Sequence, residues 1–168
     1  MSQTIQQLTE SLAKKLIQNN YQICTAESCT GGLIAKTFTD LAGSSEWFDR
    51  GFVTYSNAAK MDMLGVNSST LKNYGAVSEE VAKEMVTGAL LHSHSEVAIS
   101  VTGIAGPGGG SEGKPIGTVC FGFALKQKSG ENKVIVEKQF FEGDRAQVRE
   151  ASLLFAINRI VSFLSLSK

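Results

Sequence analysis

Hydrophobic positions along the chain follow either a helical period or compact apolar runs, and this mixture predicts an α/β protein. Ile5, Leu8, Leu12 and Leu16 recur at the spacing of an amphipathic helix over residues 4–18. Further helical patterns follow at residues 33–42, at the segment carrying Lys60 and Met63, after Ser78, and from about residue 144 to 165. Runs rich in β-branched and aromatic residues predict strands over residues 22–27, 50–55, 97–102, 116–125 and 134–141.

The order of these elements predicts a mixed sheet covered by helices. Strands alternate with helices in the first part of the chain, and residues 129–132 then link two strands as a hairpin. A long helix follows the hairpin. Because no internal repeat or linker interrupts the pattern, we expect residues 1–168 to form one domain.

Composition narrows the classes of function. The chain has 168 residues, of which 42% are hydrophobic, and its 16 basic and 16 acidic side chains balance. This balance argues against a nucleic-acid partner, which selects for excess clustered cations. No apolar run approaches the roughly 20 residues of a membrane span, and the N-terminal segment lacks the apolar core of a signal peptide. With an odd number of cysteines, 3, we expect a cytoplasmic protein with reduced thiols.

Two motif-like patterns are rejected as cofactor or metal sites. The glycines at 108, 110 and 113 match a dinucleotide fingerprint, but Pro115 and a predicted strand follow where a phosphate-binding helix is needed. His92 and His94 lie two residues apart, on different faces of any helix, and no acidic or cysteine cluster accompanies them. We therefore expect no metal and no cofactor.

The segment over residues 25–32 carries the first candidate chemistry. A predicted strand turns into a helix at Ser28, which would place its hydroxyl beside unpaired backbone N–H groups able to stabilise an oxyanion. Gly31 and Gly32 would let a ligand approach the backbone. Cys29 is a rival nucleophile, because a helix N-terminus favours a thiolate. A helix-capping serine with packing glycines is the alternative interpretation.

Tyr55 and Lys60 form the second candidate group. Tyr55 ends a predicted strand, and Lys60 lies on the first turns of the next helix. A lysine whose pKa is lowered by burial can act as a general base. A surface lysine beside a half-buried tyrosine is the alternative.

Two further segments offer groups for a phosphate or ribose. Residues 102–110 form a glycine-rich loop after a buried strand, at the edge of a sheet where α/β proteins bind ligands. Asp144 is a good N-cap for the last helix, and Arg145 follows it. Arg145 could pair with a phosphate, whereas a flexible connection and a surface arginine are the plainer interpretations.

Taken together, AESCTGG, GFVTYSNAAK, YGAVSEEVA, TGIAGPGGGSEGKPIGTV and GDR resemble the CinA C-terminal domain family over nearly the whole chain. The resemblance implies a three-layer α/β/α domain, often dimeric, so we expect a homodimer. It also implies hydrolysis of the carboxamide of nicotinamide mononucleotide to nicotinic acid mononucleotide and ammonia, in pyridine nucleotide salvage. The proposed catalytic residues of the family fall on Ser28, Tyr55 and Lys60.

On this basis we expect the substrate to contact both glycine-containing segments and the start of the last helix. The candidate binding residues are Glu27, Cys29, Thr30, Gly31, Gly32, Thr102, Gly103, Gly106 and Arg145. Ser28 would attack the amide carbon, and Lys60 would accept its proton directly or through Tyr55. The alternative function is a nucleotide-binding regulatory or interaction module that keeps the pocket without turnover.

Overall fold

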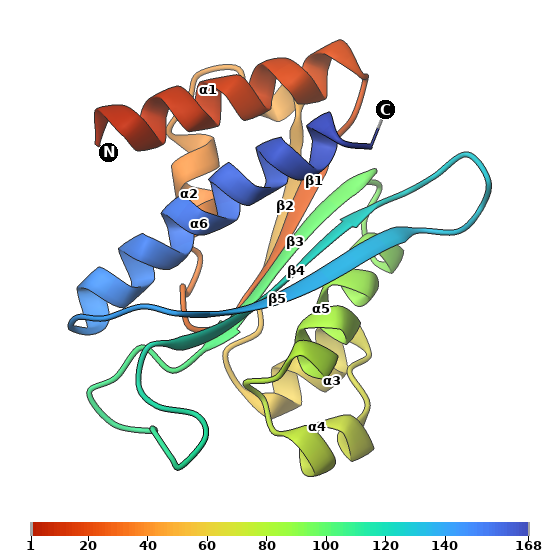
Figure 1. The fold of residues 1–168 in the computed structure, drawn as a ribbon. Coiled ribbons are helices and arrows are strands. Elements are labelled where there is room, and N and C mark those ends of the chain that lie inside the picture. Colours follow the sequence, from red (N-terminus) through yellow and green to blue (C-terminus); the bar gives the residue numbers. More distant parts are fainter. Residues whose placement is uncertain (1, 168) are drawn as a thin grey trace.

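The computed structural model describes residues 2–167 and contains one mixed five-stranded sheet in the order β2-β1-β3-β4-β5 (Figure 1). β1 is parallel to both β2 and β3, whereas β3–β4 and β4–β5 are antiparallel. The strands are β1 (Ile23–Glu27), β2 (Phe48–Val53), β3 (Val97–Gly103), β4 (Thr118–Leu125) and β5 (Lys133–Phe140). The mixed sheet and its C-terminal hairpin are confirmed.

Helices cover both faces of the sheet and make the fold three-layered (Figure 1). One face carries α1 (Gln3–Gln18), α2 (Leu33–Thr39) and α6 (Arg145–Ser165), with a short 3-10 turn at Ser44–Glu46. The other face carries α3 (Asn57–Leu64), α4 (Ser68–Tyr74) and α5 (Glu79–Leu91). Between residues 2 and 167, no helix is both long and apolar enough to cross a membrane.

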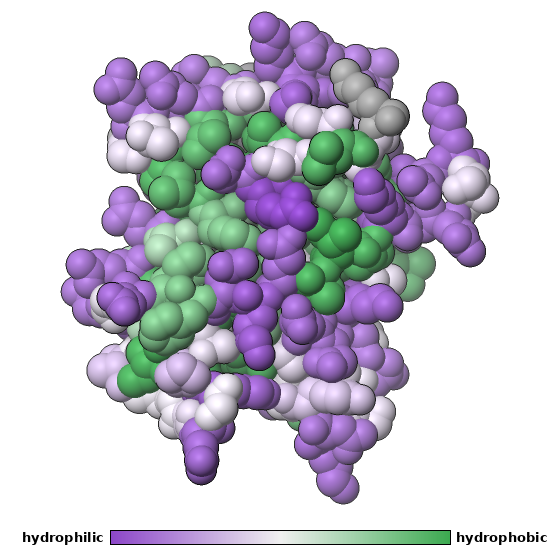
Figure 2. Space-filling view, in the orientation of Figure 1, coloured by the Kyte–Doolittle hydropathy of each residue, from purple (hydrophilic) through white to green (hydrophobic). Residues whose placement is uncertain are grey.

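α1 and α6 pack against each other because each carries one apolar stripe. Leu12 and Leu16 of α1 and Ile157 and Ile160 of α6 are fully buried in the same core. Figure 2 shows hydrophilic side chains on the outer sides of these helices and hydrophobic ones gathered between them.

On the opposite face, two glycines bring α5 close to its neighbours. A Cβ at Gly88 would lie 2.0 Å from the carbonyl oxygen of Leu64, and one at Gly122 would lie 2.7 Å from that of Ala82. The missing side chains therefore let α5 pack tightly against both α3 and β4. This packing fixes the position of α3, the helix that carries Lys60.

Three local predictions can be compared with the structure. Ser78 and Asp144 cap α5 and α6 as expected, and Asp144 forms a complete capping box with Gln147. The sequence offered Ser56 or Asn57 as the cap of α3, and the structure uses Ser56. The helix α4 was not predicted, because it is only seven residues long and most of its side chains are polar. The helix predicted over residues 33–42 begins at Leu33 as α2, so the strand-to-helix turn at Ser28 passes through a short connection before the helix starts.

Candidate active site

The candidate site lies where the parallel strands end. β2, β1 and β3 run in the same direction, so their carboxyl ends meet at one edge of the sheet. The chain leaving β1 enters α2 on one face, whereas the chain leaving β2 enters α3 on the other. Divergence of this kind opens a crevice outside the strand ends, which is where open α/β sheets bind ligands. Ser28 directly follows β1 at this edge of the sheet.

Ser28 and Lys60 form a direct pair there. The Nζ atom of Lys60 lies 3.0 Å from Ser28 Oγ and 3.0 Å from the carbonyl oxygen of Thr54. Only 1% of Lys60 and 7% of Ser28 are exposed. Burial lowers the pKa of Lys60 below its usual value of 10.5. A lysine that loses its proton more easily and touches a serine hydroxyl has the properties of a general base.

The buried carboxylate of Glu27 lies at the start of α2. Its oxygens accept hydrogen bonds from the backbone N–H groups of Gly32, Ile34 and Ala35 at 2.9–3.1 Å. The donors expected to serve Ser28 are therefore occupied by a buried carboxylate that caps the helix from the preceding strand. The prediction that Glu27 contacts substrate is not supported, because its oxygens are engaged within the fold.

The turn between Ser28 and α2 supplies other donors. Gly31 and Gly32 both have positive φ values, 58° and 94°, which an L side chain rarely adopts. The Gly31 N–H donates to the carbonyl oxygen of Ser28 at 3.0 Å. Within residues 2–167, neither the Cys29 N–H nor the Thr30 N–H donates to a backbone carbonyl. These two groups are therefore the candidate oxyanion donors beside Ser28.

The rival nucleophile Cys29 is in an unfavourable state for attack. Burial raises the pKa of its thiol to about 12, so the group is protonated at neutral pH. Its sulfur also packs near Gly103, where an added Cβ would lie 3.1 Å away. Gly103 is thus required for close packing of β3 against the Ser28 turn. The other two cysteines, Cys24 and Cys120, are fully buried in the core.

Tyr55 and Arg145 form a second hydrogen-bonded pair, which is exposed to solvent. Arg145 donates one hydrogen bond to the hydroxyl of Tyr55 at 2.9 Å and another to the carbonyl oxygen of Gly106 at 2.8 Å. The Tyr55 side chain is 60% exposed and forms no hydrogen bond with Ser28 or Lys60. The structure therefore joins Lys60 to Ser28 directly, without the tyrosine between them.

A surface depression of about 480 Å³ adjoins Arg145 and the glycine-rich loop. Its lining includes Gly106, Ile116 and Gly143. Thr102 was expected to face a ligand from the same loop, but its hydroxyl is buried and donates to the carbonyl oxygen of Ala76 at 2.8 Å. Gly106 lines the depression while its carbonyl oxygen is held by Arg145, whereas Thr102 holds the segment before α5.

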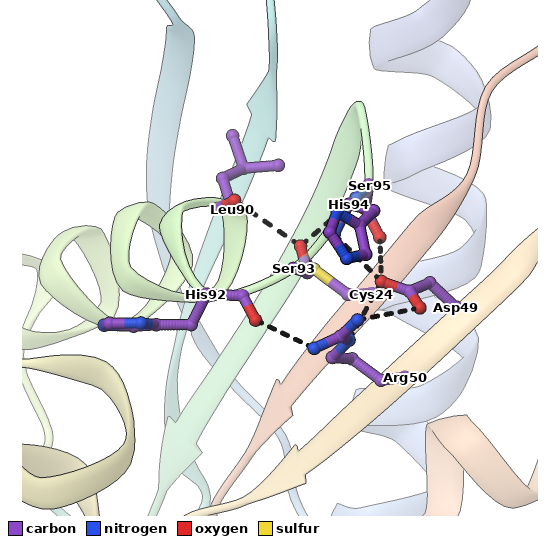
Figure 3. Close-up of polar contacts among 8 residues, drawn as sticks. All are labelled: Cys24, Asp49, Arg50, Leu90, His92, Ser93, His94 and Ser95. Atoms are coloured by element: carbon purple, nitrogen blue, oxygen red, sulfur yellow. Dashed lines mark hydrogen bonds and ion pairs between the residues drawn. The ribbon is translucent and has the colours of Figure 1, made fainter.

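A second polar cluster occupies the opposite end of the sheet (Figure 3). Asp49 accepts hydrogen bonds from Arg50 and from the backbone N–H of His94, and Ser93 lies 3.3 Å from the sulfur of Cys24. These contacts tie the loop before β3 to the starts of β1 and β2. Nowhere in residues 2–167 do three or more His, Cys, Asp or Glu side chains gather as a metal-binding group.

Two contributors to the site were missed by sequence reasoning. The carbonyl oxygen of Thr54 holds Lys60, and a backbone atom leaves no sequence signal. Arg149 donates to the carbonyl oxygen of Thr30 at 2.9 Å. Its position one helical turn after Arg145 was the available signal, because residues four apart share a helix face.

Comparison with known proteins places this geometry in a family. A model of the CinA C-terminal domain matches residues 5–164. The chain belongs to the CinA C-terminal domain family. The nicotinamide-nucleotide amidohydrolase PncC of Enterobacter agglomerans is 54% identical over 153 residues, covering 91% of each chain. PncC of Escherichia coli K12 is 49% identical over 156 residues, covering 93% of this chain and 92% of that one.

Solved structures agree with this assignment. The competence/damage inducible protein CihA from Agrobacterium tumefaciens superposes with a TM-score of 0.90 at 41% sequence identity. The match covers 98% of both chains. The α/β fold and the family resemblance predicted from the sequence are therefore confirmed.

Proposed function

We propose that this chain hydrolyses the carboxamide of a nicotinamide nucleotide, releasing ammonia and the corresponding nicotinic acid nucleotide. The observation that carries the proposal is the buried Lys60–Ser28 contact of 3.0 Å at the ends of the parallel strands. The naming of two relatives at 49% and 54% identity as nicotinamide-nucleotide amidohydrolases supports the substrate class. Nicotinamide mononucleotide is the proposed substrate.

In the proposed acylation step, Ser28 Oγ attacks the amide carbon and Lys60 Nζ takes the hydroxyl proton. The carbonyl oxygen becomes an oxyanion beside the N–H groups of Cys29 and Thr30. The carbon–nitrogen bond then breaks, and the proton held by Lys60 passes to the departing ammonia. An acyl ester on Ser28 remains.

Deacylation uses the same groups in reverse. Water enters the place that ammonia left and attacks the ester carbon while Lys60 takes its proton. The carbon–Oγ bond breaks, Ser28 recovers its proton from Lys60, and the carboxylic acid formed gives its own proton to water and leaves as the carboxylate. Both steps require a neutral lysine at their start, which agrees with the lowered pKa of Lys60.

The nucleotide end of the substrate would be held near the exposed pair of Tyr55 and Arg145. The guanidinium of Arg145 can pair with a phosphate, and the depression lined by Gly106 and Gly143 lies beside it. Tyr55, which touches Arg145, is proposed as a binding residue in this region. Binding energy from the phosphate would orient the carboxamide toward Ser28.

The decisive test measures ammonia release from nicotinamide mononucleotide by the purified chain and two matched variants. Ser28→Ala should abolish release while still binding the nucleotide, whereas Cys29→Ala should retain most activity. Binding without ammonia release by the wild type would favour the alternative, a nucleotide-binding regulatory module. An active Ser28→Ala variant with an inactive Cys29→Ala variant would reverse the assignment of the nucleophile.

A further inference from the structure

Arg149 of α6 contacts the backbone of the turn that follows Ser28. It lies on the first half of α6, and its Nη2 atom donates to the carbonyl oxygen of Thr30 at 2.9 Å. The Nε atom is buried and has no hydrogen-bond partner among residues 2–167. The same part of the chain shows no carboxylate paired with Arg149. Its positive charge is therefore directed at one peptide group of the turn.

That peptide group begins a chain of aligned dipoles. The Thr30 carbonyl and the Gly31 N–H belong to one peptide unit, and the Gly31 N–H donates to the carbonyl oxygen of Ser28 at 3.0 Å. The Ser28 carbonyl and the Cys29 N–H belong to the next unit. Since carbonyl and N–H point in opposite directions in a trans peptide, the series runs from Arg149 to the Cys29 N–H.

Hydrogen bonds in such a series polarise one another, and a charged donor at its head strengthens the effect. The Cys29 N–H at the far end donates to no backbone carbonyl and lies beside the nucleophile. We propose that Arg149 is a positioning residue that polarises the Cys29 N–H through the Thr30 and Ser28 peptide groups and holds it toward the oxyanion formed on amide attack. This inference rests on the proposed function and adds a residue to it.

The proposal distinguishes two arginines on the same helix. Arg145 forms the exposed pair with Tyr55 and would affect binding of the nucleotide. Arg149 contacts the backbone of the turn and would affect the transition state, because the oxyanion exists only after attack. Gly31 lies next to this contact, since an added Cβ would be 3.7 Å from the Arg149 guanidinium, in ordinary van der Waals contact.

The experiment compares Arg149→Ala with Arg149→Lys and with Arg159→Ala as a matched control. Arg159 also lies on α6, but it pairs with Glu137 on β5 and does not contact the Ser28 turn. Three quantities are measured: kcat for ammonia release from nicotinamide mononucleotide, the Kd of that nucleotide in a Ser28→Ala background, and the inhibition constant of the analogue carrying an aldehyde in place of the carboxamide. Ser28 adds reversibly to an aldehyde and forms an oxyanion without turnover.

Arg149→Ala should lower kcat about tenfold, because one oxyanion donor is worth about 10²- to 10³-fold and Arg149 strengthens rather than supplies it. The inhibition constant of the aldehyde should rise by a similar factor, while the nucleotide Kd stays within about twofold. Arg149→Lys should recover part of the loss because it keeps the charge and one donor. Arg159→Ala should leave all three quantities unchanged.

The proposal is overturned if kcat falls while aldehyde binding does not, or if the nucleotide Kd weakens as much as kcat. It is also overturned if Arg149→Ala behaves like Arg159→Ala. If Arg149→Ala fails to fold, Arg149→Lys alone must show a matched fall in kcat and in aldehyde affinity. A wild-type chain that releases no ammonia would refute the proposed function instead, so the two failures are distinguishable.

Discussion

Replacing Lys60 with methionine should separate catalysis from stability. The substitution keeps an unbranched apolar stem in a buried position and removes the amine that lies 3.0 Å from Ser28 Oγ. Without a base, kcat should fall by about 10²- to 10⁴-fold. Lys36→Met is the matched control, because Lys36 is an exposed lysine paired only with Asp40, and it should retain full activity.

The effect on stability should be small because two contributions oppose each other. The carbonyl oxygen of Thr54 loses its Lys60 partner, and an unsatisfied buried acceptor costs about 1–3 kcal/mol. Removing an ammonium whose charged form is disfavoured by burial offsets this cost. The free energy of unfolding should therefore change by no more than about 2 kcal/mol, and Tm should move by less than about 8 °C.

The assay follows ammonia release across pH, with thermal unfolding followed by circular dichroism. In the wild type, kcat/KM should rise as pH increases, with a midpoint below 10.5, because only neutral Lys60 can accept the serine proton. Lys60→Met should lose this rise. A folded Lys60→Met protein with activity within tenfold of the wild type would refute the assignment of Lys60 as the base.

Three further predictions concern other parts of the molecule. Arg145→Ala should lower kcat/KM for nicotinamide mononucleotide much more than for the riboside, which lacks the phosphate; an equal loss on both, in steady-state kinetics, would remove Arg145 from phosphate binding. Chelators should leave the rate of ammonia release unchanged, and a loss restored by one divalent ion would contradict this. Partial burial would raise the pKa of Asp49, but hydrogen bonds from Arg50 and the His94 N–H outweigh this effect and lower the pKa. The ionised carboxylate therefore stabilises the fold at pH values above the usual carboxyl pKa, and this stabilisation is lost as the pH falls through the lowered pKa. In denaturant unfolding, Asp49→Asn should therefore lower the free energy of unfolding by about 1 kcal/mol at pH 7 and by little at pH 3. An equal loss of stability at both pH values would show that the charge of Asp49 is not responsible.

Much of this protein follows from its sequence alone. Apolar periodicity and cap residues such as Ser56 and Asp144 predicted most helices and strands, because these signals are local and act within a few residues. The mixed sheet followed from the order of the elements. Ser28 and Lys60 were also selected from the sequence, Ser28 for its place at a strand-to-helix turn and Lys60 for its place early in the helix that follows a predicted strand.

The tertiary structure determined which contacts each of the selected residues makes. Glu27 was expected to contact a ligand but caps α2, because a carboxylate near unpaired N–H groups is drawn to them once the strand and helix are packed. Only folding brings Lys60 onto Ser28, moves Tyr55 onto Arg145, and sets Arg149 behind the turn. These contacts join residues far apart in the chain, and their distances depend on how helices seat on the sheet. Local pattern fixes the elements, but long-range packing fixes which side chains meet.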